Sequence, residues 1–275
     1  MLRGQTLDLL QRFGLRVEAT LDEQQLIDPK VIRSLIEASG IRETDKVLEI
    51  GPGAGNITVE LAARASKVFA VEKNPKFIPL LRERLQELNV KIIIGDALSV
   101  YLPDFDVLVS NLSYSIAEAT LQRLKRLRFN SASIIIPSSL ASTLIAPIGG
   151  EDYTKLTCEA RLFFDFSIVT TVKPESYYPE PKTATSIIAI KPRDSLKPTE
   201  VVVRHLLLQG DKKVGNALRE ALIAASAYGY PVTKRAAKKV VETLGLGEDA
   251  LETRVARLSL GDLDAILDRL EHHTV

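Results

Sequence analysis

Several residue types that define structural classes are scarce or missing in this chain of 275 residues. It contains one cysteine, Cys158, one methionine and no tryptophan. A single cysteine excludes an internal disulfide framework. Without a cluster of partner ligands it indicates a small buried apolar side chain, so we expect no metal site.

Long apolar segments and a strong net charge are also missing. The sequence has no run of about 18 uncharged apolar residues and no apolar signal core near its start. We therefore expect a cytoplasmic protein without membrane contacts. The formal net charge is +1, which excludes non-specific coating of nucleic acid. Any contact with nucleic acid would require a local basic patch.

The residues that are present alternate between two patterns. Short apolar runs typical of buried strands occur at residues 46–50, 67–71, 90–94, 106–109 and 133–136. Stretches with helical spacing lie between them, at residues 56–65, 75–88 and 116–127. Strands that alternate with helices predict βαβ units. We therefore expect an α/β fold with a doubly wound, mostly parallel sheet.

The pattern changes in the second half of the chain. Residues 163–172 and 185–190 resemble two strands without a helix between them, which predicts an antiparallel pair at the edge of the sheet. Beyond residue 193 only helical patterns follow, at residues 200–208, 213–227, 234–244 and 262–270. Ser259 is the expected N-cap of the last helix. We predict two domains, residues 1–193 with the sheet and residues 194–275 as a small all-helical C-terminal domain.

A glycine-rich turn follows the first predicted strand. Residues 49–55 read E-I-G-P-G-A-G and precede a helix. Gly51, Gly53 and Gly55 allow a sharp turn and a close approach of the backbone to a ligand. The spacing differs from the dinucleotide pattern G-x-G-x-x-G, which makes NAD the poorer candidate. Alone, the turn would also fit an α/β protein without a nucleotide site.

Acidic residues end the next two predicted strands. Glu72 lies roughly 20 residues after Gly51, where a carboxylate can accept hydrogen bonds from ribose hydroxyls. Asp96, in a G-D-A turn, can accept one from the exocyclic amine of adenine. Either acid alone could be a solvated strand-end residue. Together they lie at the carboxyl ends of successive strands, where open α/β sheets bind ligands, and they predict a nucleoside site.

A further motif, S-N-L-S-Y at residues 110–114, follows the fourth predicted strand. The E-I-G-P-G-x-G turn, the strand-end glutamate, G-D-A and N-L-x-Y together resemble the ribosomal RNA adenine dimethyltransferases of the KsgA type, whose motif is N-L-P-Y. Residues 24–28 (Q-Q-L-I-D), 174–182 (P-E-S-Y-Y-P-E-P-K) and 216–218 (N-A-L) resemble other segments of that family. The resemblance implies a Rossmann-like fold of the class I methyltransferases, with S-adenosylmethionine (SAM) as cofactor.

The resemblance also implies roles for individual residues. The Asn111 side-chain oxygen and the Leu112 carbonyl would hold the N6 amine of a target adenine, and Tyr114 would stack on that base once it has left its helix. Tyr177 would face the same base. The implied cofactor-binding residues are Gln25, Ile27, Gly51, Gly53, Gly55, Glu72, Lys73, Asp96, Ala97 and Asn111.

Several positions depart from the family pattern. Ser113 replaces the proline of N-L-P-Y, Glu23 replaces the glycine before the glutamine, and Gln25 replaces asparagine or histidine. Residues 137–141 lack the charged pair of the family's Q-K-E segment, and residues 210–213 are less basic than the family's run, which would weaken phosphate contacts. The basic residues that remain are Arg123, Lys125, Arg126, Arg128, Lys212, Lys213, Lys234, Arg235, Lys238 and Lys239.

Three functions are compatible with these observations. The favoured one is a SAM-dependent methyltransferase that acts on adenine N6 of small-subunit ribosomal RNA, with dimethylation near its 3′ end implied by the resemblance. Its partner would be that RNA or the small ribosomal subunit, and we expect a monomer. The second is a diverged, weakly active or inactive relative that binds SAM and RNA as a ribosome-assembly factor. The third is methylation of another RNA or of a small molecule.

Overall fold

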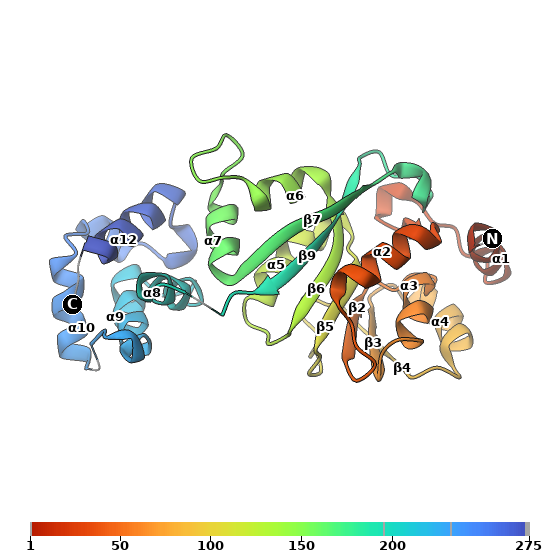
Figure 1. Cartoon of the computed structure of the whole chain (residues 1–275), viewed down its shortest axis with the longest axis horizontal. Coiled ribbons are helices and arrows are strands. Elements are labelled where there is room, and N and C mark those ends of the chain that lie inside the picture. The colour runs from red at the N-terminus through yellow and green to blue at the C-terminus, as the bar shows by residue number, and fades with distance from the viewer. Residues whose placement is uncertain (1, 195, 232, 273–275) are drawn as a thin grey trace. The chain divides into compact units, whose positions relative to one another are not determined.

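The computed structural model describes residues 2–194, 196–231 and 233–272, which fold into two compact units (Figure 1). The first unit comprises the described residues up to 145 together with residues 165–192. The second comprises residues 146–164 and the described residues from 193 onward. The domain boundary at residue 193 stays a prediction, and residues 146–164, which it assigned to the sheet domain, group with the C-terminal helices.

A sheet of seven strands among the described residues organises the first unit. Their order is β4-β3-β2-β5-β6-β9-β7. The bounds are β2 (Lys46–Ile50), β3 (Lys67–Glu72), β4 (Val90–Ile94), β5 (Val107–Asn111), β6 (Ser131–Pro137), β7 (Phe164–Val172) and β9 (Thr185–Pro192). The first five in this spatial order run parallel, and β9 is antiparallel to β6. The predicted mostly parallel α/β sheet is confirmed, with β9 and β7 at one edge.

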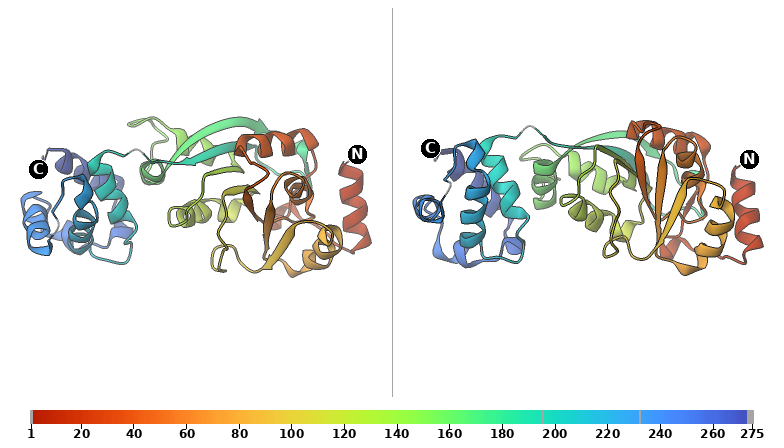
Figure 2. Two further views of the ribbon diagram at one scale, coloured as in Figure 1. Left: turned by 60° about the horizontal axis from the view of Figure 1, so that its bottom comes forward. Right: turned by 90° about the horizontal axis from the view of Figure 1, so that it is seen from below.

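Helices lie against both faces of this sheet (Figure 2). They are α2 (Pro29–Ser39), α3 (Asn56–Ala62), α4 (Ile78–Leu85), α5 (Ala117–Leu124) and α6 (Ser138–Ile145), whereas α1 (Leu2–Arg12) shares a hydrophobic cluster with α4 through Leu10. Leu35 of α2 and Leu61 of α3 share one hydrophobic core with Val47, Val107 and Ile135 of the strands. The continuous apolar runs of the central strands reflect this burial, because parallel strands are covered on both faces.

Helix α2 shows how local sequence sets an element's ends. Asp28 is its N-cap, and its carboxylate accepts a hydrogen bond from Lys30 N at 2.8 Å. Pro29 occupies the first turn, where a missing N–H leaves no bond unmade. Gly40 ends the helix in the left-handed conformation that suits glycine.

The order of the strands defines where a ligand can bind. β2 lies between β3 and β5. The chain adds β3 and β4 on one side of β2 and later adds β5 and β6 on the other side. Open α/β sheets bind ligands outside the carboxyl ends of the strands at such a point. Two short strands, β1 (Gln25–Leu26) and β8 (Tyr177–Tyr178), form a separate antiparallel pair.

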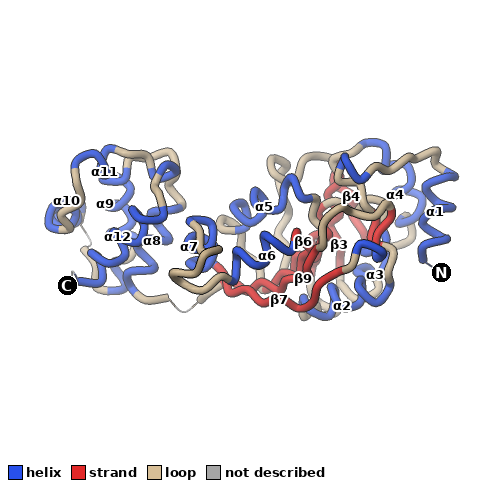
Figure 3. The backbone as a smooth tube through the Cα atoms, turned by 90° about the horizontal axis from the view of Figure 1, so that it is seen from above, coloured by secondary structure: helices blue, strands red, loops and turns tan. Residues whose placement is uncertain are grey.

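The second unit is helical, as Figure 3 shows by colour. Its helices are α7 (Lys155–Phe163), α8 (Pro198–Leu207), α9 (Val214–Ala224), α10 (Lys234–Thr243), α11 (Glu248–Glu252) and α12 (Leu260–His272). Lys155 Nζ donates to Ala256 O at 3.1 Å, and the Arg204 guanidinium lies 4.9 Å from the Phe163 ring centroid. These contacts explain why residues 146–164 group with the C-terminal helices. None of the described helices has both the length and the hydrophobicity to span a membrane.

The predicted cap of the last helix is confirmed. Ser259 Oγ accepts a hydrogen bond from Asp262 N at 3.1 Å, and Ser259 N donates to Asp262 Oδ2 at 2.8 Å. This reciprocal pair satisfies two backbone N–H groups at the start of α12.

Candidate active site

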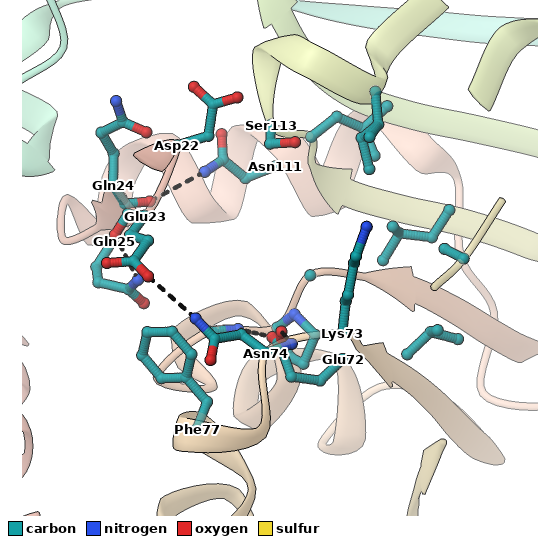
Figure 4. A pocket seen from close by; sticks show the side chains of 18 of the residues that line it. Asp22, Glu23, Gln24, Gln25, Glu72, Lys73, Asn74, Phe77, Asn111 and Ser113 are labelled. Carbon is teal, nitrogen blue, oxygen red and sulfur yellow. Dashed lines mark hydrogen bonds between the residues drawn. The ribbon is translucent and has the colours of Figure 1, made fainter. Parts of the chain in front are cut away.

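A cavity of about 540 Å³ opens at the carboxyl ends of β2, β3, β4 and β5 (Figure 4). The turns after these four strands line it, together with residues 22–26 and Tyr177 of β8. All of these residues belong to the first unit. The volume falls within the range of about 300–1,000 Å³ that is usual for small-molecule sites.

The glycine turn joins β2 to α3 at one wall of this cavity. Gly53 has a φ of 54°, and a side chain there would overlap Gln25 Oε1. Gln25 Oε1 accepts a hydrogen bond from Ala54 N at 2.7 Å, and Gln25 Nε2 donates to Glu23 O at 2.7 Å. Gln25 therefore lies in the cavity wall and also holds the glycine turn in place.

Glu72 ends β3 with its carboxylate buried, at 6% exposure. Its Oε1 accepts from Asn74 N at 2.7 Å and its Oε2 from Gly53 N at 3.2 Å. Burial raises the pKa of Glu72, and the charge of Glu23 adds to this, while the backbone N–H groups lower it. Each oxygen keeps a second lone pair that can accept a hydrogen bond from a ligand hydroxyl.

Asp96 follows β4 and lines the cavity with Ala97. Its Oδ2 forms an ion pair with Lys73 Nζ at 2.7 Å, and its Oδ1 accepts from Leu98 N at 2.9 Å. The Lys73 ammonium and the Leu98 N–H hold the pKa of Asp96 below its ordinary value. Lys73 is largely exposed, and exposed ion pairs contribute little to stability, so a ligand amine can replace it.

Asn111 ends β5 at the cavity. Its Nδ2 donates to Gln24 O at 3.5 Å, which leaves the amide oxygen as an acceptor. Leu112 follows, with its side chain buried and its N–H donating to Ile135 O at 3.2 Å. Ser110 Oγ donates to Ile50 O at 2.5 Å and so joins β5 to β2 directly beneath this turn.

The two predicted aromatic residues both line the cavity. Tyr114 is half-buried, and its hydroxyl donates to Thr183 O at 3.4 Å. Burial raises the pKa of Tyr114, and the charge of Asp22 raises it further. Tyr177 is buried, and its hydroxyl lies 2.6 Å from Thr185 Oγ1. Tyr177 is thus a wall of the cavity, and Tyr114 has the more accessible ring.

Two predicted cofactor residues, Ile27 and Gly55, are not among those that line the cavity. Ile27 is buried, and its N–H donates to Ser176 O at 2.8 Å. Gly55 has a φ of 82° at the start of α3, and a side chain there would approach Leu81 to 3.3 Å. Both residues support the lining through packing and backbone geometry.

The structure also places Glu23 at the site. The sequence analysis noted this residue only because it replaces the family's glycine. Glu23 is 8% exposed, and its Oε1 accepts from Asn74 Nδ2 at 3.0 Å and pairs with Lys76 Nζ at 2.5 Å. These contacts tie residue 23 to the turn after β3 (Figure 4). The signal that could have revealed them was an acid in a segment that otherwise matches the family.

The residue before Glu23 has an unusual backbone conformation. Asp22 is the only described residue other than glycine with a positive φ, at 56°. Asp22 holds this conformation at the C-cap of the 3₁₀ helix Ala19–Leu21, directly before Glu23.

The remaining basic residues include one with a structural contact and several in exposed ion pairs. The Arg123 guanidinium donates to Ala97 O and, at 2.6 Å, to Val100 O, so it supports the turn after β4. Other members of the basic set form ion pairs with acids of the second unit: Lys212 with Glu220, Lys213 with Glu252 and Lys238 with Glu242.

Solved structures share this architecture. A dimethyladenosine transferase from Plasmodium falciparum superposes with a TM-score of 0.61 at 24% identity, over 89% of this chain and 96% of that one. The 23S rRNA methyltransferase ErmE superposes with a TM-score of 0.58 at 23% identity, over 90% of this chain and 99% of that one. At these identities the likeness concerns the fold.

Comparisons of the amino-acid sequence identify the family of the chain. The chain is 32% identical over 269 residues to the probable ribosomal RNA small subunit methyltransferase A of Methanothermobacter thermautotrophicus, covering 97% of this chain and 96% of that protein. It is 33% identical over 221 residues to the protein of the same name from Pyrococcus abyssi, covering 80% and 82%. The model of a family described as ribosomal RNA adenine dimethylase matches residues 16–239. The chain therefore belongs to the ribosomal RNA adenine dimethylase family.

Proposed function

We propose that the protein transfers methyl groups from SAM to the N6 amine of adenines in small-subunit ribosomal RNA. Membership of the adenine dimethylase family and the cavity at the carboxyl ends of β2 to β5 support this function. The observation that carries the proposal concerns Asn111, which ends β5. Its side-chain Nδ2 donates to Gln24 O, so its Oδ1 is left to accept a hydrogen bond from an amine.

The residues around the cavity fit a SAM molecule. A side chain at Gly51 would meet no atom within 4 Å, so the backbone of the glycine turn is open to a ligand at this point of the cavity. The buried Glu72 carboxylate suits ribose hydroxyls, and Asp96 with Ala97 suits an adenine ring. When bound, the sulfonium of SAM supplies an activated methyl group, so the protein needs no nucleophilic side chain.

The reaction loop, which we define as residues 111–115, would hold the target base. The N6 lone pair of adenine is delocalised into the ring, which makes the amine a weak nucleophile. Hydrogen bonds accepted by Asn111 Oδ1 and the Leu112 carbonyl would orient the amine and favour a pyramidal nitrogen. The accessible ring of Tyr114 would stack on the flipped base. Alignment of this kind supplies much of the rate of such a transfer.

The departure at Ser113 is compatible with activity. Ser113 has φ −63° and ψ 146°, and proline fixes φ at about −65°. The backbone at this position therefore already adopts the φ that the family's proline would impose. This agreement favours a working enzyme over an inactive relative. A cytoplasmic location, a monomeric state and contacts with the whole small subunit stay predictions.

Transfer of a radioactive methyl group from SAM tests the function. The substrates are small ribosomal subunits that lack adenine dimethylation and, as a comparison, large subunits from the same cells. We expect incorporation into the small-subunit RNA only, and at least 100-fold slower incorporation with Asn111→Ala, because an orienting contact to the reacting amine is lost. Equal rates for parent and variant, or incorporation into large subunits alone, would contradict the proposal.

A further inference from the structure

Two hydrogen bonds join the reaction loop to residues 22–24 beside the cavity. Asp22 Oδ2 accepts from Ser115 N at 3.1 Å, and Gln24 O accepts from Asn111 Nδ2 at 3.5 Å. The bonded residues are 93 and 87 positions apart in the sequence. Figure 4 shows the Asp22 carboxylate near the side chains of Asn111 and Ser113. The two ends of the reaction loop are thus held by the same distant segment.

Asp22 adopts an unfavourable backbone conformation where it makes this contact. Its φ of 56° and ψ of 34° lie in the left-handed region, where a side chain crowds the backbone. Glycine would occupy the position without strain. Strained residues persist where the surrounding structure over-determines them, often at functional sites. Asp22 adopts this conformation as the C-cap of the 3₁₀ helix Ala19–Leu21, and aspartate tolerates it better than most residues; the contact that glycine could not make there is the one to Ser115 N.

The backbone N–H groups at the start of the short helix after Ser113 need a hydrogen-bond acceptor. This 3₁₀ helix, Tyr114–Ile116, leads into α5, and the side chain of Ser113 at its N-cap position makes no capping hydrogen bond. The Ser115 N–H is satisfied by Asp22 instead. A serine at position 113 also lacks the ring with which a proline would restrict the residue before it. Asp22, which lies outside the reaction loop in the sequence, thus restrains that loop.

We propose that Asp22 is a positioning residue that holds the reaction loop in the conformation a proline at position 113 would otherwise enforce. Its carboxylate binds the Ser115 N–H and so keeps Asn111 and Leu112 directed at the target amine. The inference rests on the proposed function and adds a residue to it. Asp22 itself does not need to touch the adenine or SAM.

Four variants separate this role from a merely structural one. Asp22→Gly removes the carboxylate and the backbone strain, whereas Asp22→Asn keeps an acceptor for the Ser115 N–H. Asp104→Asn, at an exposed position away from the cavity lining, controls for the loss of one negative charge. The double variant Asp22→Gly/Ser113→Pro adds the missing ring. For each variant, kcat, the Kd for SAM and the melting temperature are measured.

We expect Asp22→Gly to lower kcat at least tenfold while the Kd for SAM stays within threefold and the melting temperature is unchanged or higher. Asp22→Asn and Asp104→Asn should stay within threefold of the parent's kcat. Adding Ser113→Pro to Asp22→Gly should recover most of the lost rate. A parental kcat in Asp22→Gly, a parallel loss of SAM affinity and melting temperature, or no recovery with proline would each overturn the proposal.

Hydrogen exchange tests the same contact without catalysis. The Ser115 amide should exchange at least tenfold faster in Asp22→Gly than in the parent and at the parental rate in Asp22→Asn. Unchanged exchange in Asp22→Gly would refute the contact even if the parent proved inactive on RNA. An inactive parent with faster exchange in Asp22→Gly would refute the proposed function and leave the positioning contact supported.

Discussion

Replacing Glu49 with glutamine should change how the stability of the first unit depends on pH. Glu49 lies in β2 at 1% exposure, and its Oε2 has no hydrogen-bond partner among the described residues. Burial raises the pKa of Glu49 to about 8. Thr58 and Arg84 lower it, and the charge of Glu72 raises it further. Glu49 is therefore protonated in the folded unit at neutral pH.

The sign and size of the effect follow from proton binding. The ordinary pKa of 4.5 applies to the unfolded chain, which releases this proton well below the folded value of about 8. Between these values the folded state binds more protons, so stability is lost as pH rises, by about 1.4 kcal/mol for each pH unit. Glutamine has a similar shape and no proton to release, so the variant should not show this loss.

Urea unfolding at pH 5, 6, 7 and 8, followed by circular dichroism without SAM, provides the measurement. The free energy of unfolding of Glu49→Gln minus that of the parent should increase steadily with pH across this window. Glu43→Gln, the same change at an exposed position before β2, should give a flat difference. A flat difference for Glu49→Gln as well would show that Glu49 titrates normally, and the assigned protonation would be wrong.

Substitutions at three further positions test the cavity and its support. Glu72→Ala should weaken SAM binding by about 1–3 kcal/mol, because it removes a buried acceptor; unchanged affinity in calorimetry would exclude the ribose role. Arg123→Ala should weaken SAM binding several-fold, since Ala97 O loses its donor, and Arg123→Lys should recover part of the loss; equal affinities for all three proteins would contradict this support. Tyr177→Phe should lower the free energy of unfolding by about 1 kcal/mol, because the Thr185 hydroxyl loses its partner; a parental value in urea unfolding would show that this hydrogen bond contributes nothing.

Sequence patterns predicted the central strands well because burial governs them. The predicted run 46–50 coincides with β2, and the run 67–71 covers all of β3 but its last residue. These strands lie in a parallel sheet, where apolar residues follow one another without a polar face. The location of Glu72 and Asp96 at one cavity was also predictable, since Glu72 ends β3 and Asp96 follows β4, and the carboxyl ends of these neighbouring parallel strands share one edge of the sheet.

Helix α1 and several contacts between residues far apart in the sequence were not predicted. α1 is missing from the prediction because it buries few side chains, among them Thr6, whose hydroxyl pairs with Asn56. No local sequence pattern predicts such a contact. Asp22 and Glu23 were missed for the same reason, because their partners come from the turns after β3 and β5. Tertiary contacts, which periodicity does not encode, set this part of the site.

The identity of the product nucleoside tests the proposed reaction most directly. Small-subunit RNA is methylated by the parent and by Asn111→Ala, digested to nucleosides and analysed by mass spectrometry. We expect N6-methylated and N6,N6-dimethylated adenosine with the parent and neither above background with Asn111→Ala. A methyl group on another nucleoside or at another adenine position, or the same products from both proteins, would contradict the assignment of the reaction loop to the N6 amine.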